Sequence, residues 1–353
     1  MSLTRIQLRK AKSIAFYAIA WLLACTFFFL LRFFGRPNLL DWETLMATLI
    51  QFAILSGLSH GIYEVFVLGD GRFQRPWGQT LIMRLLFFSG MLFANILAVF
   101  LLWSLRESGE MFSPAGKEKL CSLIKEPEAE VFILYAFVIA FAITFVRSVT
   151  KKFGFRVMAN ALLGKFQDAV EEERIFLFLD LRSATTLAEE IGHEAYSAFL
   201  REYFHLVSNC CEENHGEIYQ FAGDGVILSW PMRICRKTAR PLTCFQDLVI
   251  CFRNCRPWFE KRFHHSPQFK AAIHIGRVIS TEVGNFGSAM AYHGDTLNTT
   301  ARIQALCNLL KKDLLVSDSF VRKMPNLAGY RATSQGTFQL KGKNQDLEIF
   351  SME

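Results

Sequence analysis

The 353-residue sequence lacks several patterns that would place it in common classes of protein. None of its nine cysteines forms a Cys-x-x-Cys pair, and no histidine spacing completes a zinc site. The net charge of +7 is not gathered into a basic tract, so we expect no nucleic-acid partner. A Ser-His-Asp or Cys-His constellation for nucleophilic catalysis is also missing. Any chemistry in this chain must therefore use other residue types.

Hydrophobic residues are abundant instead. They make up 52% of the chain, and the mean hydropathy is +0.23, which is high for a soluble protein. Each of four apolar stretches approaches or exceeds the about 20 residues that cross a bilayer as a helix: 13–34, 44–68, 81–105 and 131–146. The first is too long for a signal peptide, and no small-x-small cleavage site follows it. The sequence predicts a four-helix transmembrane domain over residues 1–146.

Basic residues indicate the orientation of these spans. The N-terminal segment carries Arg5, Arg9, Lys10 and Lys12 without an acidic residue, and a second basic segment, residues 147–156, follows the fourth span. Because cytoplasmic flanks are enriched in Lys and Arg, we expect both termini to be cytoplasmic. Most of the cysteines then lie in the cytosol, where thiols stay reduced, and we interpret them as packing residues.

Three ionisable residues, His60, Glu64 and Arg84, fall within the predicted spans. A charge at mid-membrane costs about 2.5–3.5 kcal/mol on insertion scales, so such residues are usually paired inside a helix bundle. Structural polar contacts are one interpretation, and a ligand or cofactor site within the bundle is the other.

Two apolar runs in the second half of the chain, residues 175–181 and 220–230, each carry one carboxylate. Asp180 lies near the end of residues 175–181, and Asp224 lies in a Gly-Asp-Gly turn that suits a tight hairpin between two strands. If the strands are neighbours, both carboxylates share one edge of the sheet and form an oxygen site suited to Mg²⁺. The alternative is that Asp180 caps the next helix and Asp224 is an ordinary turn residue.

A third pattern covers residues 293–302. Its Gly-Asp-Thr predicts a helix start, with Asp295 or Thr296 as the N-cap. Asn298 and Arg302 are one turn apart and share a helix face, which suits an anionic transition state. An ordinary capped helix with a surface arginine is the alternative.

The domain order follows from these patterns. After the membrane domain, residues 147–173 are predicted to connect the halves, with a helix over 153–173 that pairs with its copy in a dimer. The cytoplasmic domain, residues 174–353, alternates strands and helices. We expect an α+β sandwich with helices on one face of a mainly antiparallel sheet.

Three motifs occur together in this domain. They are Phe-Leu-Asp-Leu-Arg-Ser-Ala-Thr at 178–185, Gly-Asp-Gly around Asp224, and Gly-Asp-Thr-Leu-Asn-Thr-Thr-Ala-Arg at 294–302, with the two aspartates 44 residues apart (224 − 180 = 44). In this order and spacing, residues 174–353 resemble the catalytic domain of class III nucleotidyl (adenylate/guanylate) cyclases, which implies a ferredoxin-like fold. The membrane half is similar to the multi-helix anchors of some bacterial members, which implies a bacterial inner-membrane protein with a cytoplasmic catalytic domain.

The resemblance also implies roles for individual residues. Asp180, Asp224 and the Leu181 carbonyl would bind two Mg²⁺ ions, with Mn²⁺ able to substitute. Ser183, Ala184 and Thr185 would cradle phosphate oxygens, and Lys341 would reach the terminal phosphates. Asn298 would orient the ribose, and Arg302 would neutralise charge on the α-phosphate. Since the metal and Asn/Arg halves face each other across a dimer interface in this family, a homodimer that uses ATP is expected.

Two positions depart from the family pattern. Adenylate cyclases of this family carry Lys four residues before the second metal aspartate, and Asp or Thr seven residues before the asparagine. Gln220 and Ala291 occupy these positions here. The base therefore stays open between adenine, guanine and relaxed specificity. A catalytically weak nucleotide-binding scaffold is the alternative from another functional class.

Overall fold

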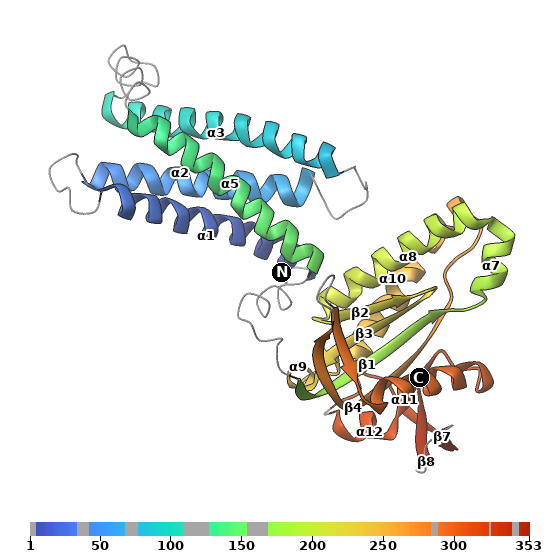
Figure 1. Ribbon diagram of the computed structural model, residues 1–353. Helices are drawn as coiled ribbons and strands as arrows, with labels where there is room; N and C mark the ends of the chain where they lie inside the picture. Colours follow the sequence, from blue (N-terminus) through green and yellow to red (C-terminus); the bar gives the residue numbers. More distant parts are fainter. Residues whose placement is uncertain are drawn as a thin grey trace. The chain divides into compact units, whose positions relative to one another are not determined.

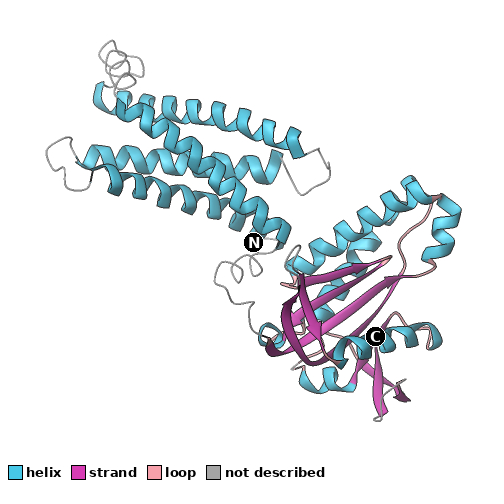
Figure 2. Ribbon diagram, in the orientation of Figure 1, coloured by secondary structure: helices cyan, strands magenta, loops and turns pink. Residues whose placement is uncertain are grey.

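A computed structural model describes residues 5–33, 42–67, 77–108, 127–153, 169–283, 289–324, 326–340 and 346–353 (Figure 1). The chain divides into two compact units, Met1–Phe155 and Arg156–Glu353, and each is described by itself. Within the described residues, the first unit is helical, whereas every strand belongs to the second unit (Figure 2).

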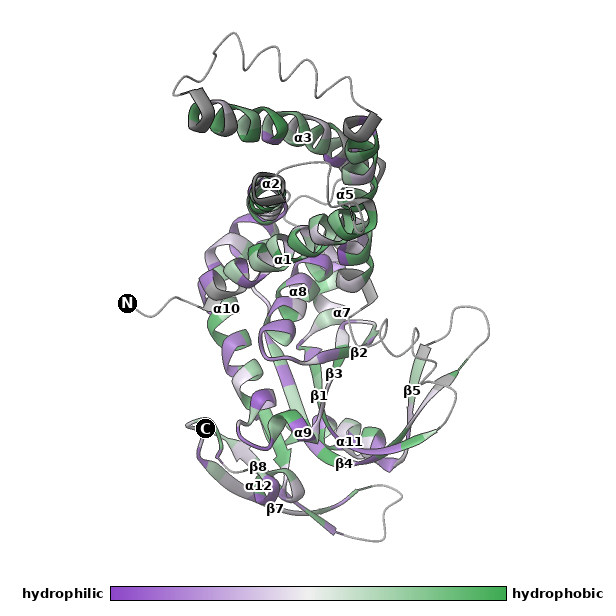
Figure 3. Cartoon of the chain, turned by 90° about the vertical axis from the view of Figure 1, so that its left-hand side faces the viewer, coloured by the Kyte–Doolittle hydropathy of each residue, from purple (hydrophilic) through white to green (hydrophobic). Residues whose placement is uncertain are grey.

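Four long helices build the first unit: α1 (Arg5–Phe33), α2 (Trp42–Ile62), α3 (Trp77–Ser108) and α5 (Pro127–Phe153). Each contains 21 or 22 residues with a mean hydropathy between 1.3 and 2.4, which is long and apolar enough to cross a membrane. Hydrophobic residues surround much of each helix (Figure 3), and large side chains such as Leu23 and Phe93 face outward. The prediction of four apolar helices is confirmed.

His60 on α2 is fully buried, and both of its ring nitrogens are hydrogen-bonded. The Trp21 indole N–H of α1 donates to His60 Nδ1 at 3.2 Å, and Thr144 Oγ1 of α5 lies 3.2 Å from His60 Nε2. An indole nitrogen can only donate, so Nδ1 must be the acceptor, and Nε2 carries the proton in the neutral ring. Both nitrogens are therefore engaged in packing contacts, which favours the structural interpretation of this residue.

Glu64 and Arg84 form an ion pair inside the same unit. Glu64 lies in a π-helical turn, η1 (Tyr63–Val67), that ends α2, and its Oε1 is 3.0 Å from Arg84 Nε. Arg84 also donates to Glu64 Oε2 at 3.2 Å and to Ser148 Oγ at 3.0 Å. The expected pairing of ionisable residues within the helix bundle is confirmed for Glu64 and Arg84.

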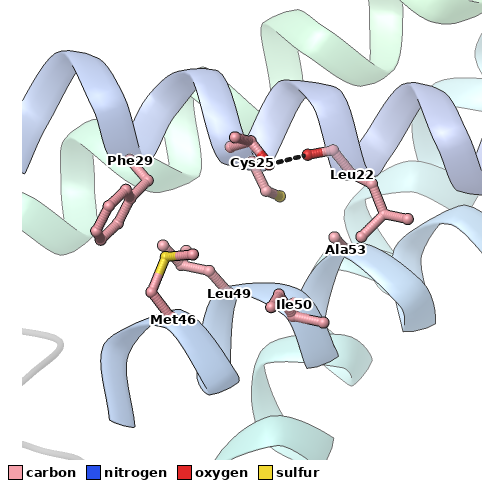
Figure 4. A pocket seen from close by; sticks show the side chains of 8 residues that line it. Leu22, Cys25, Phe29, Met46, Leu49, Ile50 and Ala53 are labelled. Atoms are coloured by element: carbon pink, nitrogen blue, oxygen red, sulfur yellow. Dashed lines mark hydrogen bonds between the residues drawn. The ribbon is translucent and has the colours of Figure 1, made fainter. Parts of the chain in front are cut away.

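A small crevice lies between α1 and α2 (Figure 4). Its lining is apolar, apart from Thr26, whose hydroxyl donates to the Leu22 carbonyl oxygen at 2.8 Å. Phe29 and Met46 approach one another across one end of it. Because the Thr26 hydroxyl is already paired with the backbone, we assign no binding or catalytic role to this crevice.

The second unit is built on an eight-stranded sheet. Seven of the strands follow the order β2-β3-β1-β4-β6-β8-β7, and the eighth strand, β5, pairs with β4. All pairs are antiparallel except β4–β6. The strands are β1 (Val170–Leu181), β2 (Glu217–Ala222), β3 (Gly225–Pro231), β4 (Phe269–Val283), β5 (Ala289–His293), β6 (Leu314–Ser317), β7 (Ala332–Gln339) and β8 (Asp346–Met352).

The helices of this unit are α7 (Ala184–Ile191), α8 (His193–Glu213), α9 (Met232–Cys235), α10 (Arg240–Phe263), α11 (Asp295–Leu309) and α12 (Asp318–Lys323). Helices α7 and α8 are separated at Gly192, whose φ of +81° favours glycine.

Helices cover both faces of the sheet, so the prediction of helices on one face is wrong. Alternate residues of β4 belong to different cores. Ala271 and Ile273 pack with α8 and α10, whereas Ala272 packs with Ile303 and Cys307 of α11 on the opposite face. Both faces of β4 and β6 are apolar, and a sheet that is apolar on both faces needs a layer on each.

The helix predicted to end at Glu173 is also wrong at its C-terminal end. Residues 170–173 belong to β1, where Val170 pairs with Ser280 and Glu173 pairs with Arg277 of β4. The composition of this charged run favours a helix, but its pairing with the long strand β4 makes it part of a strand. Residues 154–168 lie outside the described residues, and the proposed domain boundaries at 146 and 173 stay predictions.

Candidate active site

The structure brings Asp180 and Asp224 together at one edge of the sheet. Asp180 is the penultimate residue of β1 and pairs with Gly225, which directly follows Asp224 in the β2–β3 hairpin. The two carboxyl groups lie near enough for the charge of Asp180 to affect the ionisation of Asp224. Burial, together with the neighbouring Asp180 carboxylate, raises the pKa of Asp224 above its ordinary value. A cation between the two would relieve this repulsion.

Two glycines make the approach possible. Gly223 has a φ of +61° in the hairpin turn, a conformation that side chains with a Cβ rarely adopt. A Cβ on Gly225 would lie 3.2 Å from Asp180 Oδ1 and 3.2 Å from the Leu179 carbonyl oxygen. A side chain would be strained at position 223 and crowded against β1 at position 225, so the geometry favours glycine on both sides of Asp224.

Lys270 completes the charge arrangement, and sequence reasoning missed it. It lies opposite Asp180 on β4, with its Nζ 3.3 Å from Asp180 Oδ2. The same ammonium donates to Asn308 Oδ1 near the end of α11, also at 3.3 Å. No sequence motif marks Lys270, because its role follows from strand pairing between residues 90 positions apart (270 − 180 = 90).

The carboxylate pair fits Mg²⁺ by its chemistry. Both ligands are hard oxygens at a partly exposed sheet edge, which suits a metal that keeps water or phosphate oxygens as further ligands. Among the described residues, no group of three or more His, Cys, Asp or Glu side chains surrounds a cation position. A metal held here would therefore need backbone, water or substrate oxygens, and Leu181, whose carbonyl is a predicted ligand, follows Asp180 as the last residue of β1.

The N-terminus of α7 lies three residues after Asp180. Ser183 adopts a left-handed conformation with a φ of 55° and makes no side-chain cap. Ala184 and Thr185 begin the helix, and the first N–H groups of any helix have no intrahelical acceptor. Exposed N–H groups at a helix start, close to a metal-binding carboxylate pair, suit phosphate oxygens.

Asn298 and Arg302 lie on the outer face of α11, as their spacing predicts. Thr299, Thr300 and Ile303 form the buried face, whereas Asn298 is exposed and Arg302 is half-buried. Arg302 Nη1 is itself buried and has no hydrogen-bond partner within the described residues. An orphaned guanidinium N–H group of this kind suits an anionic oxygen supplied by a ligand.

The predicted cap of this helix is wrong. Gly294, with a φ of +141°, is the N-cap residue, and it makes no side-chain cap. The Thr296 hydroxyl instead donates to the Arg277 carbonyl oxygen at 2.8 Å, which fastens the helix to β4. Tertiary packing therefore uses the hydroxyl that the sequence pattern assigns to capping.

The metal-binding edge and the Asn/Arg face are separated within one chain. The C-terminal end of α11 is near Asp180, because Lys270 donates a hydrogen bond to Asn308 and also pairs with Asp180. Asn298 comes ten residues earlier, about 15 Å along the helix axis at 1.5 Å per residue. Thr296, at the start of the helix, contacts Gly276, which pairs with Arg174 rather than with Asp180. Asn298 and the start of α11 therefore lie toward the end of β1 that is away from Asp180.

The comparison with protein families decides the classification. Residues 168–353 match the family model described as the adenylate and guanylate cyclase catalytic domain. The chain belongs to this family. The second unit is the cyclase-family domain of the chain, and the predicted family is confirmed.

Relatives support this assignment. The chain is 30% identical over 220 residues to adenylate cyclase 2 of Rhizobium meliloti (strain 1021), which covers 62% of this chain and 61% of that protein. It is 26% identical over 195 residues to adenylate cyclase 1 of the same organism, covering 52% and 28%. The chain thus spans less than two thirds of either relative. A bacterial light-regulated adenylyl cyclase shares the fold, with a TM-score of 0.53 at 19% identity over 65% of this chain and 67% of that chain.

Within the cyclase-family domain, the two residues predicted to contact the base, Gln220 and Ala291, each follow or precede a tyrosine, and these two tyrosines are in contact. Gln220 is exposed on β2 and Ala291 is half-buried on β5. The residues beside them, Tyr219 and Tyr292, have ring centroids 4.9 Å apart. β5 then runs directly into α11, so these positions belong with the Asn/Arg half. Lys341 lies outside the described residues, and its role stays a prediction.

Proposed function

We propose that this chain is a membrane-anchored nucleotidyl cyclase that converts ATP into 3′,5′-cyclic AMP and pyrophosphate for intracellular signalling. The observation that carries the proposal is the Asp180–Asp224 carboxylate pair at the end of β1, in a domain of the cyclase family. In the reaction, the ribose 3′-oxygen forms a bond to the α-phosphorus, the bond to the pyrophosphate oxygen breaks, and the 3′-hydroxyl proton leaves.

Asp180, Asp224 and the Leu181 carbonyl would hold two Mg²⁺ ions. When bound, the metals would supply activation of the 3′-hydroxyl and charge stabilisation on the triphosphate. Lys270 holds Asp180 in place from the neighbouring strand. Gly225, which has no Cβ, leaves room beside Asp180 Oδ1. The chain thus supplies a preorganised oxygen site at an exposed edge.

The remaining residues would bind the nucleotide. The N–H groups around Ser183, Ala184 and Thr185 would receive phosphate oxygens, and Lys341 would neutralise the terminal phosphates. Asn298 would fix the ribose. Arg302, whose Nη1 has no hydrogen-bond partner in the described part of the chain, would donate to the α-phosphate as its charge increases.

A homodimer would complete the active site. In one chain, Asn298 lies toward the end of β1 that is away from Asp180, which supports a site shared between two chains. A two-fold axis would bring the metal-binding half of one protomer to the Asn/Arg half of the other, and would create two equivalent sites. Ile279 and Phe221, which are exposed on β4 and β2, are consistent with such a contact.

Purified full-length protein in lipid nanodiscs, assayed with Mg²⁺ and each nucleoside triphosphate in turn, tests the activity. We expect cyclic nucleotide and pyrophosphate to form in equal amounts, most rapidly from ATP, with Mn²⁺ able to replace Mg²⁺. Tight binding of nucleotide without pyrophosphate release would instead identify a signalling scaffold.

The four apolar helices would anchor the chain in a bacterial inner membrane with both termini in the cytoplasm. In a Ser2→Cys, Cys121→Ala variant, the thiol introduced at position 2 should resist an impermeant thiol reagent in intact cells and react after permeabilisation. Native Cys121, in the predicted outer loop, is the positive control and should react in intact cells. Labelling at position 2 without permeabilisation would contradict this topology.

Base selectivity should be modest. The Gln220 amide can donate or accept, but Ala291 has no side-chain hydrogen-bonding group, so the base is read through few contacts. We expect an ATP over GTP preference in kcat/KM below about 100-fold, since only firmly hydrogen-bonded pockets reach 10⁴ or more. The Gln220→Lys, Ala291→Asp variant should raise this preference by about tenfold or more. Strict ATP selectivity that survives Gln220→Ala would show that the base is read elsewhere.

A further inference from the structure

Arg174, near the start of β1, is fully buried although it carries a charge. Its Nη1 donates to Glu172 Oε1 at 3.1 Å, and its Nη2 donates to Ser229 Oγ at 2.9 Å and to the Glu217 carboxylate. Glu217 begins β2 and Ser229 lies in β3, so one guanidinium joins these strands to β1. None of these residues belongs to the carboxylate pair or the Asn/Arg half of the candidate active site.

The guanidinium also lies over an aromatic ring. Arg174 Cζ is 4.6 Å from the ring centroid of Tyr292 on β5, which is within the range of a cation–π contact. The Tyr292 ring is 4.9 Å from that of Tyr219 on β2. Both tyrosine rings lie against Phe176 of β1, with centroid distances of 5.5 Å for Tyr292 and 6.5 Å for Tyr219. Arg174 therefore contacts a cluster of rings that connects β2, β1 and β5.

This aromatic cluster lies next to the two positions predicted to contact the base. Tyr219 directly precedes Gln220, and Tyr292 directly follows Ala291. The register of β2 against β3 shifts between Ile218 and Gln220, which makes Tyr219 an extra residue in a β-bulge. A bulge changes the direction of nearby side chains. The placement of Gln220 therefore depends on where Tyr219 packs, and that of Ala291 on where Tyr292 packs.

From these contacts we propose that Arg174 is a positioning residue for selection of the base. It holds the start of β2 through Glu217, and it holds β5 through the Tyr292 ring. These two contacts fix the separation of the strands that carry Gln220 and Ala291. Because Arg174 is fully buried, it acts through these strands and does not touch the nucleotide. The inference rests on the proposed function, in which both positions contact the base.

The planar guanidinium suits this role. Arg174 donates to acceptors on three strands from the edge of the group, while its flat face is left for the Tyr292 ring. The lysine ammonium is a compact point charge and cannot reproduce both kinds of contact. Arg174→Lys therefore keeps the buried charge but loses the geometry that joins β2 to β5.

The ratio of kcat/KM for ATP to kcat/KM for GTP, measured on the full-length protein in nanodiscs, tests the proposal. Arg174→Lys should lower this ratio by at least about threefold, which is the size of coupling found between residues in contact. A structural role alone would change only the amount of folded protein. Both rates would then fall equally and the ratio would stay constant, so an unchanged ratio would overturn the proposal.

Lys323→Met is the matched control. Lys323 of α12 is a cation that pairs with Glu173, the neighbour of Arg174 in β1. Phe320 of the same helix packs in the core that contains α8 and α10, on the other face of the sheet from α11. The loss of this half-exposed ion pair should leave the ATP/GTP ratio within about twofold. A fall as large as that of Arg174→Lys would show that any damage to β1 changes selectivity, and would overturn the proposal.

Two variants of Tyr292 test the same contact while keeping the arginine. Tyr292→Phe retains the ring under the guanidinium and should keep the ratio, whereas Tyr292→Leu removes the ring and should lower it as Arg174→Lys does. Equal ratios in the two variants would overturn the proposal even if Arg174→Lys fails to fold.

The unmodified protein separates this inference from the function on which it rests. Turnover with an ATP preference that none of the variants changes would overturn the role of Arg174 alone. Equal use of ATP and GTP by the unmodified protein would also overturn that role, because there would be no base selection to maintain. No turnover of either nucleotide would overturn the proposed function, and the inference with it.

Discussion

Asp180→Asn and Asp224→Asn should each lower the cyclisation rate by at least about 100-fold, comparable to losing one preorganised electrostatic contact in other enzymes. Each substitution keeps the side-chain shape but removes a charged oxygen ligand from the proposed Mg²⁺ site. The fold should be almost unaffected. The Asp180 side chain is 27% exposed. Its negative charge is attracted by Lys270 but repelled by Asp224, so the loss of the charge also removes this repulsion.

The measurement is cyclic nucleotide formation at saturating ATP and Mg²⁺, with the thermal unfolding midpoint as the check on folding. Asp313→Asn is the matched control. Asp313 is an exposed aspartate near the same end of β1, paired with Arg182 at 2.7 Å, and its loss should leave the rate within about twofold, as expected for a surface ion pair. If either active-site variant keeps more than about a tenth of the activity, a difference of only 1.36 kcal/mol, the metal assignment is wrong.

Mixing an inactive Asp180→Ala chain with an inactive Arg302→Ala chain should restore activity. Each homodimer lacks one essential group in both sites. A mixed dimer combines the intact Asn/Arg half of one protomer with the intact metal-binding half of the other, and has one complete site. With random pairing, half of the dimers are mixed and each has one working site of two, so about a quarter of the unmodified activity is expected.

The control for this experiment is a mixture of Asp180→Ala with Asp224→Ala. Both changes damage the metal-binding half, so every site in every dimer is incomplete and no recovery is expected. Size-exclusion chromatography and differently tagged chains would establish that mixed dimers form. Mixed dimers of the first pair that form but stay inactive would show that one chain supplies both halves of a site.

The sequence by itself determined the features that depend on local composition. Apolar length alone identifies the four helices that are long and apolar enough to cross a membrane, because a bilayer accepts few other segments. The turn before Asp224 is equally local, since the φ of +61° at Gly223 favours glycine there. The spacing of Asn298 and Arg302 fixed their common outer face, because an α-helix places residues four apart side by side.

Contacts between distant residues were decided by the tertiary structure. Lys270 lies against Asp180 because β4 pairs with β1 in one register, and a shift of one residue would have turned it away. The acidic residues before β1 are extended because β4 is long enough to pair with them. His60 contacts Trp21 and Thr144 on two other helices. Such pairings depend on how whole elements pack, and local propensity does not record this.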